Sequence, residues 1–356
     1  MIDEGSQLRH HLMAAGIVEK YTRRGWRERL QDVYEPSRLC RSGSDRCRHL
    51  RKTHPTFAAA QIAGLPVTSA KTFSHQGGDL AFMKAAQAKK LTLAVGCTND
   101  ELAGLASGNT QPLVAAIRQF TDIVAWVCVG NEPLGSWHNG RYNDVLVPAA
   151  RNVAAAFKQA GLDIGVTVPQ NFEFMQDSYP PSAGTVKPDL VSIIQATCAV
   201  MRSSGAPFMV NIYPFITHVQ NPKDVSLPYC LFTAGPEQWV HDGNYTYTNI
   251  FDAMLDALHV ALGRIGCGDL EIVVGECGWP TNGGLDATVN NAQIFNQNLI
   301  YHCKSGRGTP RYPGKQIQCF VFEMYDEDTK PVDAGQFERF WGVKGGNGSF
   351  KYGLNW

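Results

Sequence analysis

Short apolar runs rich in β-branched residues alternate, from residue 57 onward, with stretches whose apolar residues recur every three or four positions. The first pattern predicts buried strands and the second predicts amphipathic helices. We expect strands at residues 67–73, 91–96, 123–130, 164–168, 208–213, 270–275 and 317–325. We expect helices at residues 79–89, 111–119, 143–159, 190–203, 245–264 and 287–303. Because strands and helices alternate without a break in composition, the strands should lie parallel in one sheet.

Both a doubly wound sheet and a closed barrel would satisfy this alternation. No GxGxxG motif follows a predicted strand and no GxxxxGK[ST] motif occurs, so the glycine-rich signatures of phosphate-binding loops are absent from the sequence. The polar residues of interest fall at the carboxyl ends of several predicted strands, where barrel active sites are built. The sequence therefore predicts an α/β fold of the (β/α)8 TIM-barrel type.

The first strand of such a barrel is unclear or missing in the pattern. Residues 57–65 could form a helix that leads into the strand at residues 67–73, but no run of strand composition lies within loop reach upstream. The strand is therefore either hidden within residues 1–56 or lost. We expect one barrel domain at residues 57–356, preceded by an atypical basic and poorly ordered segment at residues 1–56.

Charge distinguishes these two regions. Residues 1–56 hold 12 Lys and Arg against 7 Asp and Glu, whereas the whole chain is balanced at 32 of each. The basic segment has almost no apolar periodicity, which favours a poorly ordered segment over a nucleic-acid-binding arm. The neutral total gives no reason to expect a nucleic-acid partner. No apolar run approaches the roughly 18 residues that indicate a membrane span.

The cysteines and the amino terminus add little to the prediction of fold or function. The ten cysteines form no CxxC pair and no Cys/His cluster of zinc spacing, and no HExxH motif occurs, so we expect no metal and no cofactor. The count would allow one or two disulfides with the pairing open, although several cysteines lie in apolar runs where they pack as small hydrophobes. The amino terminus carries no recognisable export signal, and the glycosylation sequons at Asn244 and Asn347 support secretion only weakly.

Two glutamates stand at the ends of apolar strands. Glu132 follows the strand at residues 123–130, and Glu276 follows the strand at residues 270–275. Each alone could be structural, but an unpaired buried carboxylate is costly and needs a reason. Glycoside cleavage needs one acid and one ionised carboxylate on either side of the bond, which two such glutamates could supply. Nearby, Trp279 offers an apolar face on which a sugar ring could stack, or else it fills the core.

The segment from about residue 57 to residue 356 resembles the glycoside hydrolases of family 17, the plant-type β-1,3-glucanases. The motifs that carry the resemblance are VGNEP at 129–133, PPSAG at 180–184, NIYPF at 211–215, EIVVGECGWP at 271–280, FEMYDEDTK at 322–330 and ERFWGV at 338–343. Their order and spacing match the family along this whole segment.

The resemblance implies endo-hydrolysis of β-1,3-glucan with retention on a (β/α)8 barrel. Glu132 falls on the family's proton donor and Glu276 on its nucleophile. Asn131 would bind the 2-hydroxyl group of the sugar, and Tyr213 matches an aromatic residue of the active site. Three further residues fall on a polar cluster near the nucleophile: Glu327, Lys330 and Glu338.

The chain departs from the family pattern in four places. Gly275 and Cys277 stand where Ser or Thr is usual beside the nucleophile. Lys71 and Phe73 replace the Arg and Tyr of an Arg-x-Tyr pattern, which removes a phenolic hydroxyl. Glu323 stands where a small residue is usual. The opening strand with its Gly-x-x-Tyr-Gly pattern is missing, and that strand normally supplies core residues and a substrate tyrosine.

Three functions stay open on this basis. The first is an endo-β-1,3-glucanase, and the second is another enzyme with the same site, such as a mixed-linkage β-glucanase or a glucan transglycosylase. The third is a catalytically impaired relic or glucan-binding protein, which the missing first strand motivates. In each case the expected partner is a β-glucan polysaccharide. By resemblance we expect a monomer that acts outside the cell or in the cell wall.

Overall fold

The computed structural model describes residues 14–17 and 67–356, and these residues form one nine-stranded sheet with two small hairpins. The sheet has the order β5-β4-β3-β2-β1-β13-β12-β9-β6. Strands β5 (Gly165–Thr167) and β6 (Gln170–Asn171) are consecutive pieces of one stretch, and they pair with β4 and β9 at opposite ends of that order. The sheet therefore closes on itself, and β5 together with β6 fills one of the eight positions of a (β/α)8 barrel.

Every strand pair that does not involve β1 is parallel in this sheet. The remaining strands of the barrel are β2 (Ser69–Lys71), β3 (Thr92–Cys97), β4 (Val124–Val129), β9 (Phe208–Asn211), β12 (Ile272–Cys277) and β13 (Gln318–Val321). All lie inside the predicted ranges or within two residues of them. Parallel pairing brings their carboxyl ends to one end of the barrel.

Strand β1 (Ala14–Ile17) fills the position between β13 and β2 and runs antiparallel to both neighbours. A strand is therefore present within residues 1–56. This agrees with the first of the two alternatives for the opening strand, that it is hidden in this segment. Its direction is the reverse of what a (β/α)8 barrel predicts. The rest of residues 1–56 and the helix predicted at residues 57–65 lie outside the described residues, so the expected poor order of that segment and the domain boundary stay predictions.

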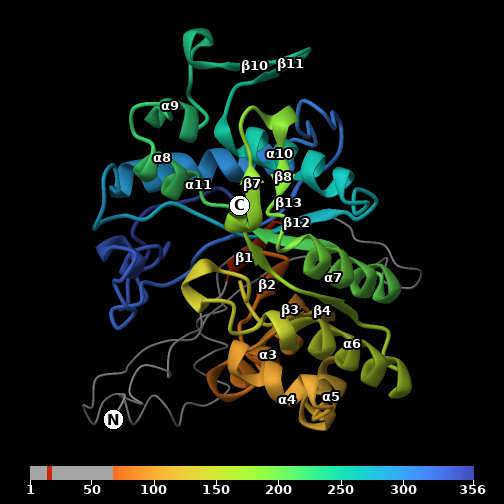
Figure 1. The fold of residues 1–356 in the computed structure, drawn as a ribbon. Coiled ribbons are helices and arrows are strands. Elements are labelled where there is room, and N and C mark those ends of the chain that lie inside the picture. Colours follow the sequence, from red (N-terminus) through yellow and green to blue (C-terminus); the bar gives the residue numbers. More distant parts are fainter. Residues whose placement is uncertain (1–13, 18–66) are drawn as a thin grey trace, which may run out of the picture.

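Helices cover the outside of the strands, as Figure 1 shows for α3 to α7 beside β2, β3 and β4. The predicted helices are present as α3 (Gly77–Lys89), α5 (Gln111–Ile117), α6 (Asn143–Gln159), α7 (Val191–Ser204), α10 (Ile250–Arg264) and α11 (Val289–Lys304). Three shorter helices were not predicted: α4 (Leu102–Ala106), α8 (Pro214–Gln220) and α9 (Leu227–Cys230). None of the helices among the described residues combines the length and the apolar composition that a membrane-spanning helix needs.

The predicted start of the helix at residues 245–264 is wrong. Residues Tyr245–Tyr247 form β11, which pairs with β10 (Val240–Asp242) in a hairpin that projects from the barrel in Figure 1. The helix begins only after Asn249, whose side chain accepts a hydrogen bond from the amide of Asp252 at 2.8 Å. This cap satisfies a free amide of the first turn and therefore fixes where α10 begins. A second hairpin joins β7 (Met175–Asp177) and β8 (Thr185–Val186).

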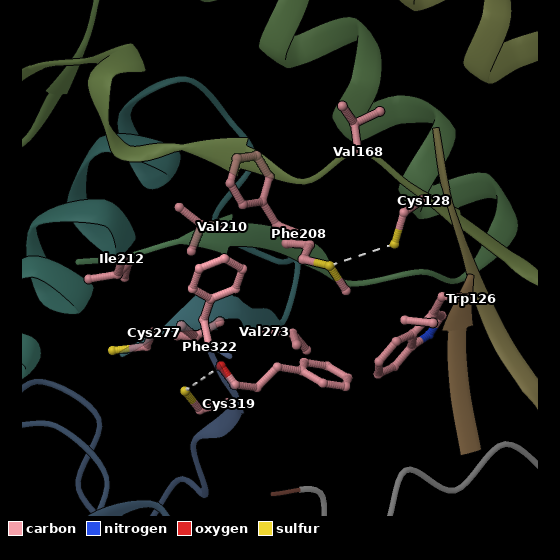
Figure 2. Close-up of a cluster of buried hydrophobic side chains, with 14 of the residues drawn as sticks. Trp126, Cys128, Val168, Phe208, Val210, Ile212, Val273, Cys277, Cys319 and Phe322 are labelled. Carbon is pink, nitrogen blue, oxygen red and sulfur yellow. Dashed lines mark hydrogen bonds between the residues drawn. The ribbon is translucent and has the colours of Figure 1, made fainter. Parts of the chain in front are cut away.

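The core lies between the strands and the helices, and cysteines form part of it. Figure 2 shows Cys128, Cys277 and Cys319 among apolar side chains that include Trp126 and Phe208. The eight cysteines among the described residues are all free and buried, so the interpretation that they pack as small hydrophobes is confirmed for them. The other two cysteines lie outside the described residues.

Candidate active site

Glu132 lies just beyond the carboxyl end of β4 in a tightly held turn. Its backbone φ is +50°, a conformation that residues other than glycine rarely adopt and that is often found at functional positions. Its amide donates to the carbonyl of Pro169 at 2.8 Å. The side chain of Asn99 donates to the carbonyl of Asn131 and accepts from the amide of Asn131, each at 2.8 Å. These bonds fix the backbone that carries both side chains of the predicted donor motif.

An irregularity in β12 sets the position of Glu276. The pairing of β12 with β9 and with β13 gains one extra residue after Val274. Such a bulge re-aims the side chains around it and is common beside active sites. A Cβ on Gly275 would lie 2.7 Å from Met209 Cγ and 2.8 Å from Asn211 Oδ1. The residue before Glu276 therefore has to be glycine for the neighbouring side chains to lie where they do.

Lys71, the last residue of β2, contacts the predicted nucleophile directly. Its side chain is almost fully buried, and its Nζ donates to Glu276 Oε1 at 2.5 Å and to Asn131 Oδ1 at 3.1 Å. The same nitrogen lies 4.3 Å from the centroid of the Phe73 ring. An ammonium group has three N–H donors. Two of them donate to Glu276 and Asn131, and the charge also lies against the Phe73 ring. The positive charge lies directly against one oxygen of the Glu276 carboxyl group.

Two residues of the NIYPF segment connect the glutamates. Asn211 at the end of β9 pairs in register with Glu276, and its Nδ2 donates to Glu132 Oε1 at 2.8 Å. The hydroxyl of Tyr213 donates to Glu276 Oε2 at 2.6 Å. Burial and then the charge of Glu276 raise the pKa of Tyr213 well above its ordinary value, so the phenol keeps the proton that it donates. The structure thus brings Asn131, Glu132, Tyr213 and Glu276 to one site, where Lys71 and Tyr213 bind Glu276 and Asn211 binds Glu132.

The two carboxyl groups have opposite surroundings. Burial, followed by the negative charge of Glu276, raises the pKa of Glu132 to about 8. The hydrogen bond from Asn211 and the charge of Lys71 act in the other direction but are outweighed. Glu132 is therefore protonated at neutral pH, whereas Glu276 accepts hydrogen bonds from an ammonium and a phenol. A neutral carboxylic acid beside an ionised carboxylate is the division of roles that glycoside cleavage requires.

The three residues predicted as a polar cluster also lie together. Lys330 Nζ lies 2.8 Å from Glu338 Oε2 and 3.9 Å from Glu327 Oε2. Burial alone would lower the pKa of Lys330, but the surrounding carboxylates, Glu338 first, raise it above its ordinary value. The ring of Phe322 contacts both groups of residues, since it lies 5.1 Å from Lys330 Nζ and packs edge-on at 5.8 Å against Tyr213.

Glu323 adds an isolated carboxyl group to that cluster. Its side chain is fully buried, and neither carboxyl oxygen has a hydrogen-bond partner among the described residues. Burial and then the charge of Glu327 raise the pKa of Glu323 well above its ordinary value, which favours the neutral form of the group. The acidic residues here do not form a metal site: no group of three or more metal-ligating side chains gathers within residues 14–17 and 67–356.

The prediction that a sugar ring stacks on Trp279 is wrong. Trp279 is 0% exposed, and its indole nitrogen donates to the carbonyl of Asp286 at 3.0 Å. The rings of Phe215 and Phe295 pack against it with centroids at 5.1 and 5.4 Å. The indole therefore fills the core behind the nucleophile strand, which is the alternative that its sequence position left open.

Three residues of the site had no assigned role in the sequence. Lys71 was recognised only as the replacement of an arginine, and Asn99 and Asn211 were not singled out. Each stands at the carboxyl end of a predicted barrel strand or just beyond it, and that position is the signal that could have found them. Asn211 also opens the NIYPF motif.

Comparisons with known proteins agree with this geometry. A family model described as glycosyl hydrolases family 17 matches residues 69–356. The basic isoform of glucan endo-1,3-beta-glucosidase from Phaseolus vulgaris is 36% identical over 261 residues, which are 70% of this chain and 73% of that protein. The glucan endo-1,3-beta-glucosidase of Pisum sativum is 36% identical over 273 residues, which are 74% of this chain and 71% of that protein.

Solved structures extend the agreement to the fold. CJP38, a beta-1,3-glucanase and allergen of Cryptomeria japonica pollen, superposes with a TM-score of 0.78 at 28% identity, covering 85% of this chain and 95% of that one. One of two plant beta-glucan endohydrolases with distinct substrate specificities superposes with a TM-score of 0.74 at 32% identity, with the same coverage of both chains. These likenesses confirm the predicted (β/α)8 fold. The family match over most of the chain shows that this protein belongs to the glycosyl hydrolases of family 17.

Proposed function

We propose that this family 17 hydrolase cleaves internal β-1,3 linkages of β-glucan and retains the anomeric configuration. The observation that carries the proposal is the unequal pair of carboxyl groups: the pKa of Glu132 is raised to about 8, while Glu276 is held by Lys71 and Tyr213. The substrate class is supported by relatives that are named glucan endo-1,3-beta-glucosidases.

In the first step, a carboxylate oxygen of Glu276 attacks the anomeric carbon while Glu132 gives its proton to the leaving glycosidic oxygen. The bond from carbon to that oxygen breaks, and a glycosyl ester of Glu276 forms. Lys71 and Tyr213 orient the attacking carboxylate through bonds to its two oxygens. Asn131 is placed to bind the sugar hydroxyl next to the reacting carbon.

In the second step, Glu132 now carries a negative charge and acts as a base. It takes a proton from a water molecule, the water oxygen attacks the anomeric carbon, and the ester to Glu276 breaks. Asn211 donates to Glu132 and pairs with the residue that carries the ester, so it can hold both groups in register through the cycle. Retention requires the two carboxyl groups to lie about 5–5.5 Å apart.

The remaining features of the proposal concern the whole protein. We place the Lys330 cluster, with Glu327 and Glu338, at the side of the bound glucan. We expect residues 57–356 to act as one domain and the protein to work as a monomer on wall glucan outside the cell. A mixed-linkage β-glucanase and a glucan transglycosylase would use the same two glutamates, and they differ in their products.

The test replaces each glutamate separately. Glu276→Ala should reduce release of reducing ends from laminarin by roughly 10³-fold or more, and azide should restore turnover of an activated aryl glucoside as an α-glucosyl azide. Glu132→Ala should lose activity on laminarin and, with azide on the activated substrate, give a β-glucosyl azide. Glu271→Gln is the matched control, because this exposed glutamate precedes the other end of β12.

Two product measurements decide the finer claims. Proton NMR of early hydrolysis should show the β-anomer first, and an α-anomer would contradict retention. Laminarin should yield oligosaccharides, and mixed-linkage glucan little product. Products longer than the starting oligosaccharide would identify a transglycosylase instead. Laminarin cleavage at the wild-type rate by Glu276→Ala would remove the assignment of the nucleophile.

A further inference from the structure

A tryptophan lies exposed in the loop that follows the proposed proton donor. Trp137 is 53% exposed and belongs to η4 (Ser136–His138), between β4 and α6. It stands five positions after Glu132, at the end of the barrel where parallel strands deliver the site residues. The tryptophans closest to the nucleophile segment, Trp279 and Trp341, are 0% and 1% exposed. Trp137 therefore offers what Trp279 does not, an indole that a ligand can reach.

The indole is connected to the donor motif by short contacts. Trp137 Nε1 donates to His138 Nε2 at 3.0 Å, and that imidazole nitrogen lies 3.4 Å from Asn99 Nδ2. Asn99 in turn donates to the carbonyl of Asn131 at 2.8 Å. Since both neighbours of His138 Nε2 are N–H groups, that nitrogen is an acceptor and the ring is neutral. The polar atom of the indole is thus used inside the protein, which leaves only apolar surface for a ligand.

The loop that carries Trp137 is fixed on both sides. Ser136 donates from its hydroxyl to Glu173 Oε2 at 2.8 Å, and Glu173 lies in η5 (Phe172–Phe174) directly after β6. Gly135 lies against the indole: a Cβ at this glycine would be 2.5 Å from Trp137 Cζ2. An exposed ring that is held by its neighbours before a ligand arrives loses little conformational entropy on binding.

We propose that Trp137 is a stacking platform for a glucosyl unit of the β-1,3-glucan next to the pair of units that is cleaved. This inference rests on the proposed function and assigns it an additional binding residue. Pyranose rings present patches of C–H groups that pack on indole faces, and the apolar area that they bury favours binding. Because the indole contacts the donor motif through His138 and Asn99 rather than through Glu132 itself, it binds substrate without taking part in bond cleavage.

The test compares Trp137→Ala, Trp137→Phe and wild type on laminari-oligosaccharides of increasing length. Trp137→Ala should raise KM about tenfold on long oligosaccharides, which corresponds to about 1.4 kcal/mol, with kcat near the wild-type value. The effect should disappear on the shortest substrates, which do not reach the platform, and Trp137→Phe should lie between. Tyr301→Ala is the matched control, because Tyr301 is 52% exposed but lies in the last turn of α11, at the other end of the barrel.

Binding provides a second measurement that does not need turnover. In the Glu276→Gln background, calorimetry with laminarihexaose should give a Kd about tenfold weaker when Trp137 is also Ala. Gly135→Ala should weaken binding as well, because its methyl group displaces the indole. If the wild-type protein hydrolyses laminarin and Trp137→Ala has the same KM as wild type, this inference alone is overturned. A wild-type protein that neither binds nor cleaves laminarin would overturn the proposed function too.

Discussion

A carboxylic acid can donate a proton only while it still has one, and Glu132 keeps its proton because burial and the charge of Glu276 raise its pKa to about 8. The acid form is required, so kcat/KM should fall as the pH rises through about 8. A pH–rate profile on laminari-oligosaccharides measures this limb. In Glu132→Gln, tested on an activated aryl glucoside that needs no acid, the limb should be absent. A wild-type limb near pH 5 would contradict the assignment.

Lys71 makes a second prediction at the residue scale. Lys71→Met leaves Glu276 without the ammonium that lies 2.5 Å away, so kcat should fall by roughly 10²-fold. The loss should be larger in kcat than in KM, because the ammonium positions the attacking carboxylate. Lys71→Arg keeps the charge and should retain more activity than Lys71→Met. If both variants keep the wild-type kcat, Lys71 acts only in packing.

The sequence could predict the two glutamates because each stands at the end of a long apolar strand, a local feature. It could not predict the role of Lys71, since this residue and Glu276 are 205 positions apart and meet only when the barrel closes. The burial of Trp279 was equally inaccessible, because it depends on Phe215 and Phe295 packing from other elements.

At the scale of the element, the bulge in β12 links the proposed nucleophile to the proposed proton donor. Gly275→Ala would place a methyl group 2.8 Å from Asn211 Oδ1, so Asn211 has to move away from Glu132. We expect a loss of stability of about 1–3 kcal/mol and at least a roughly tenfold fall in kcat/KM. Thermal melting and steady-state kinetics measure the two effects. Gly104→Ala in α4, where a Cβ meets nothing within 4 Å, is the matched control.

The segment after β13 carries the prediction for Glu323. Its folded-state pKa is raised, so the unfolded chain releases this proton at a lower pH than the folded protein does. Stability is therefore lost as the pH rises above the ordinary glutamate range and up to the raised pKa. The side chain of the Glu323→Gln variant cannot ionise. Its unfolding free energy relative to wild type should therefore increase by about 1–3 kcal/mol from pH 4 to pH 8. Melting curves at several pH values measure this difference. Parallel stability curves would show that Glu323 finds a partner in the protein.

Long elements, which repeat their apolar pattern several times, were predictable from the sequence, and short elements were not. The helix at residues 143–159 agrees with α6 residue for residue, because nearly five turns of alanine-rich pattern have one interpretation. Residues 245–247 have apolar positions that continue the pattern of α10, yet they form β11 because β10 pairs with them. A local pattern does not show which strands pair with each other, so a hairpin with strands of three residues cannot be predicted from it.

At the scale of the whole molecule, the alternation of strands and helices predicted a parallel α/β sheet, and the polar residues at the carboxyl ends of the strands favoured the barrel. The strand that closes the barrel, β1, was not predictable from local pattern. Strand β1 pairs through Ala15 with Val321 on one side and Ala70 on the other. Ala15→Pro removes an N–H from an interior strand, so unfolding should require about 1–3 kcal/mol less. Ala15→Gly keeps that N–H and should cost less, about 0.5–1 kcal/mol. Equal melting temperatures for the proline variant and wild type would contradict a structural role of β1.

The reversed direction of β1 has a practical consequence for anyone who attaches something to this protein. Ala14 stands opposite Lys71 in the strand pairing, so the upstream end of β1 faces the catalytic mouth, where every parallel strand of the barrel has its downstream end. A fluorescent protein or affinity tag joined directly ahead of Ala14 would start at the entrance for the polysaccharide and should obstruct long glucans more than short ones.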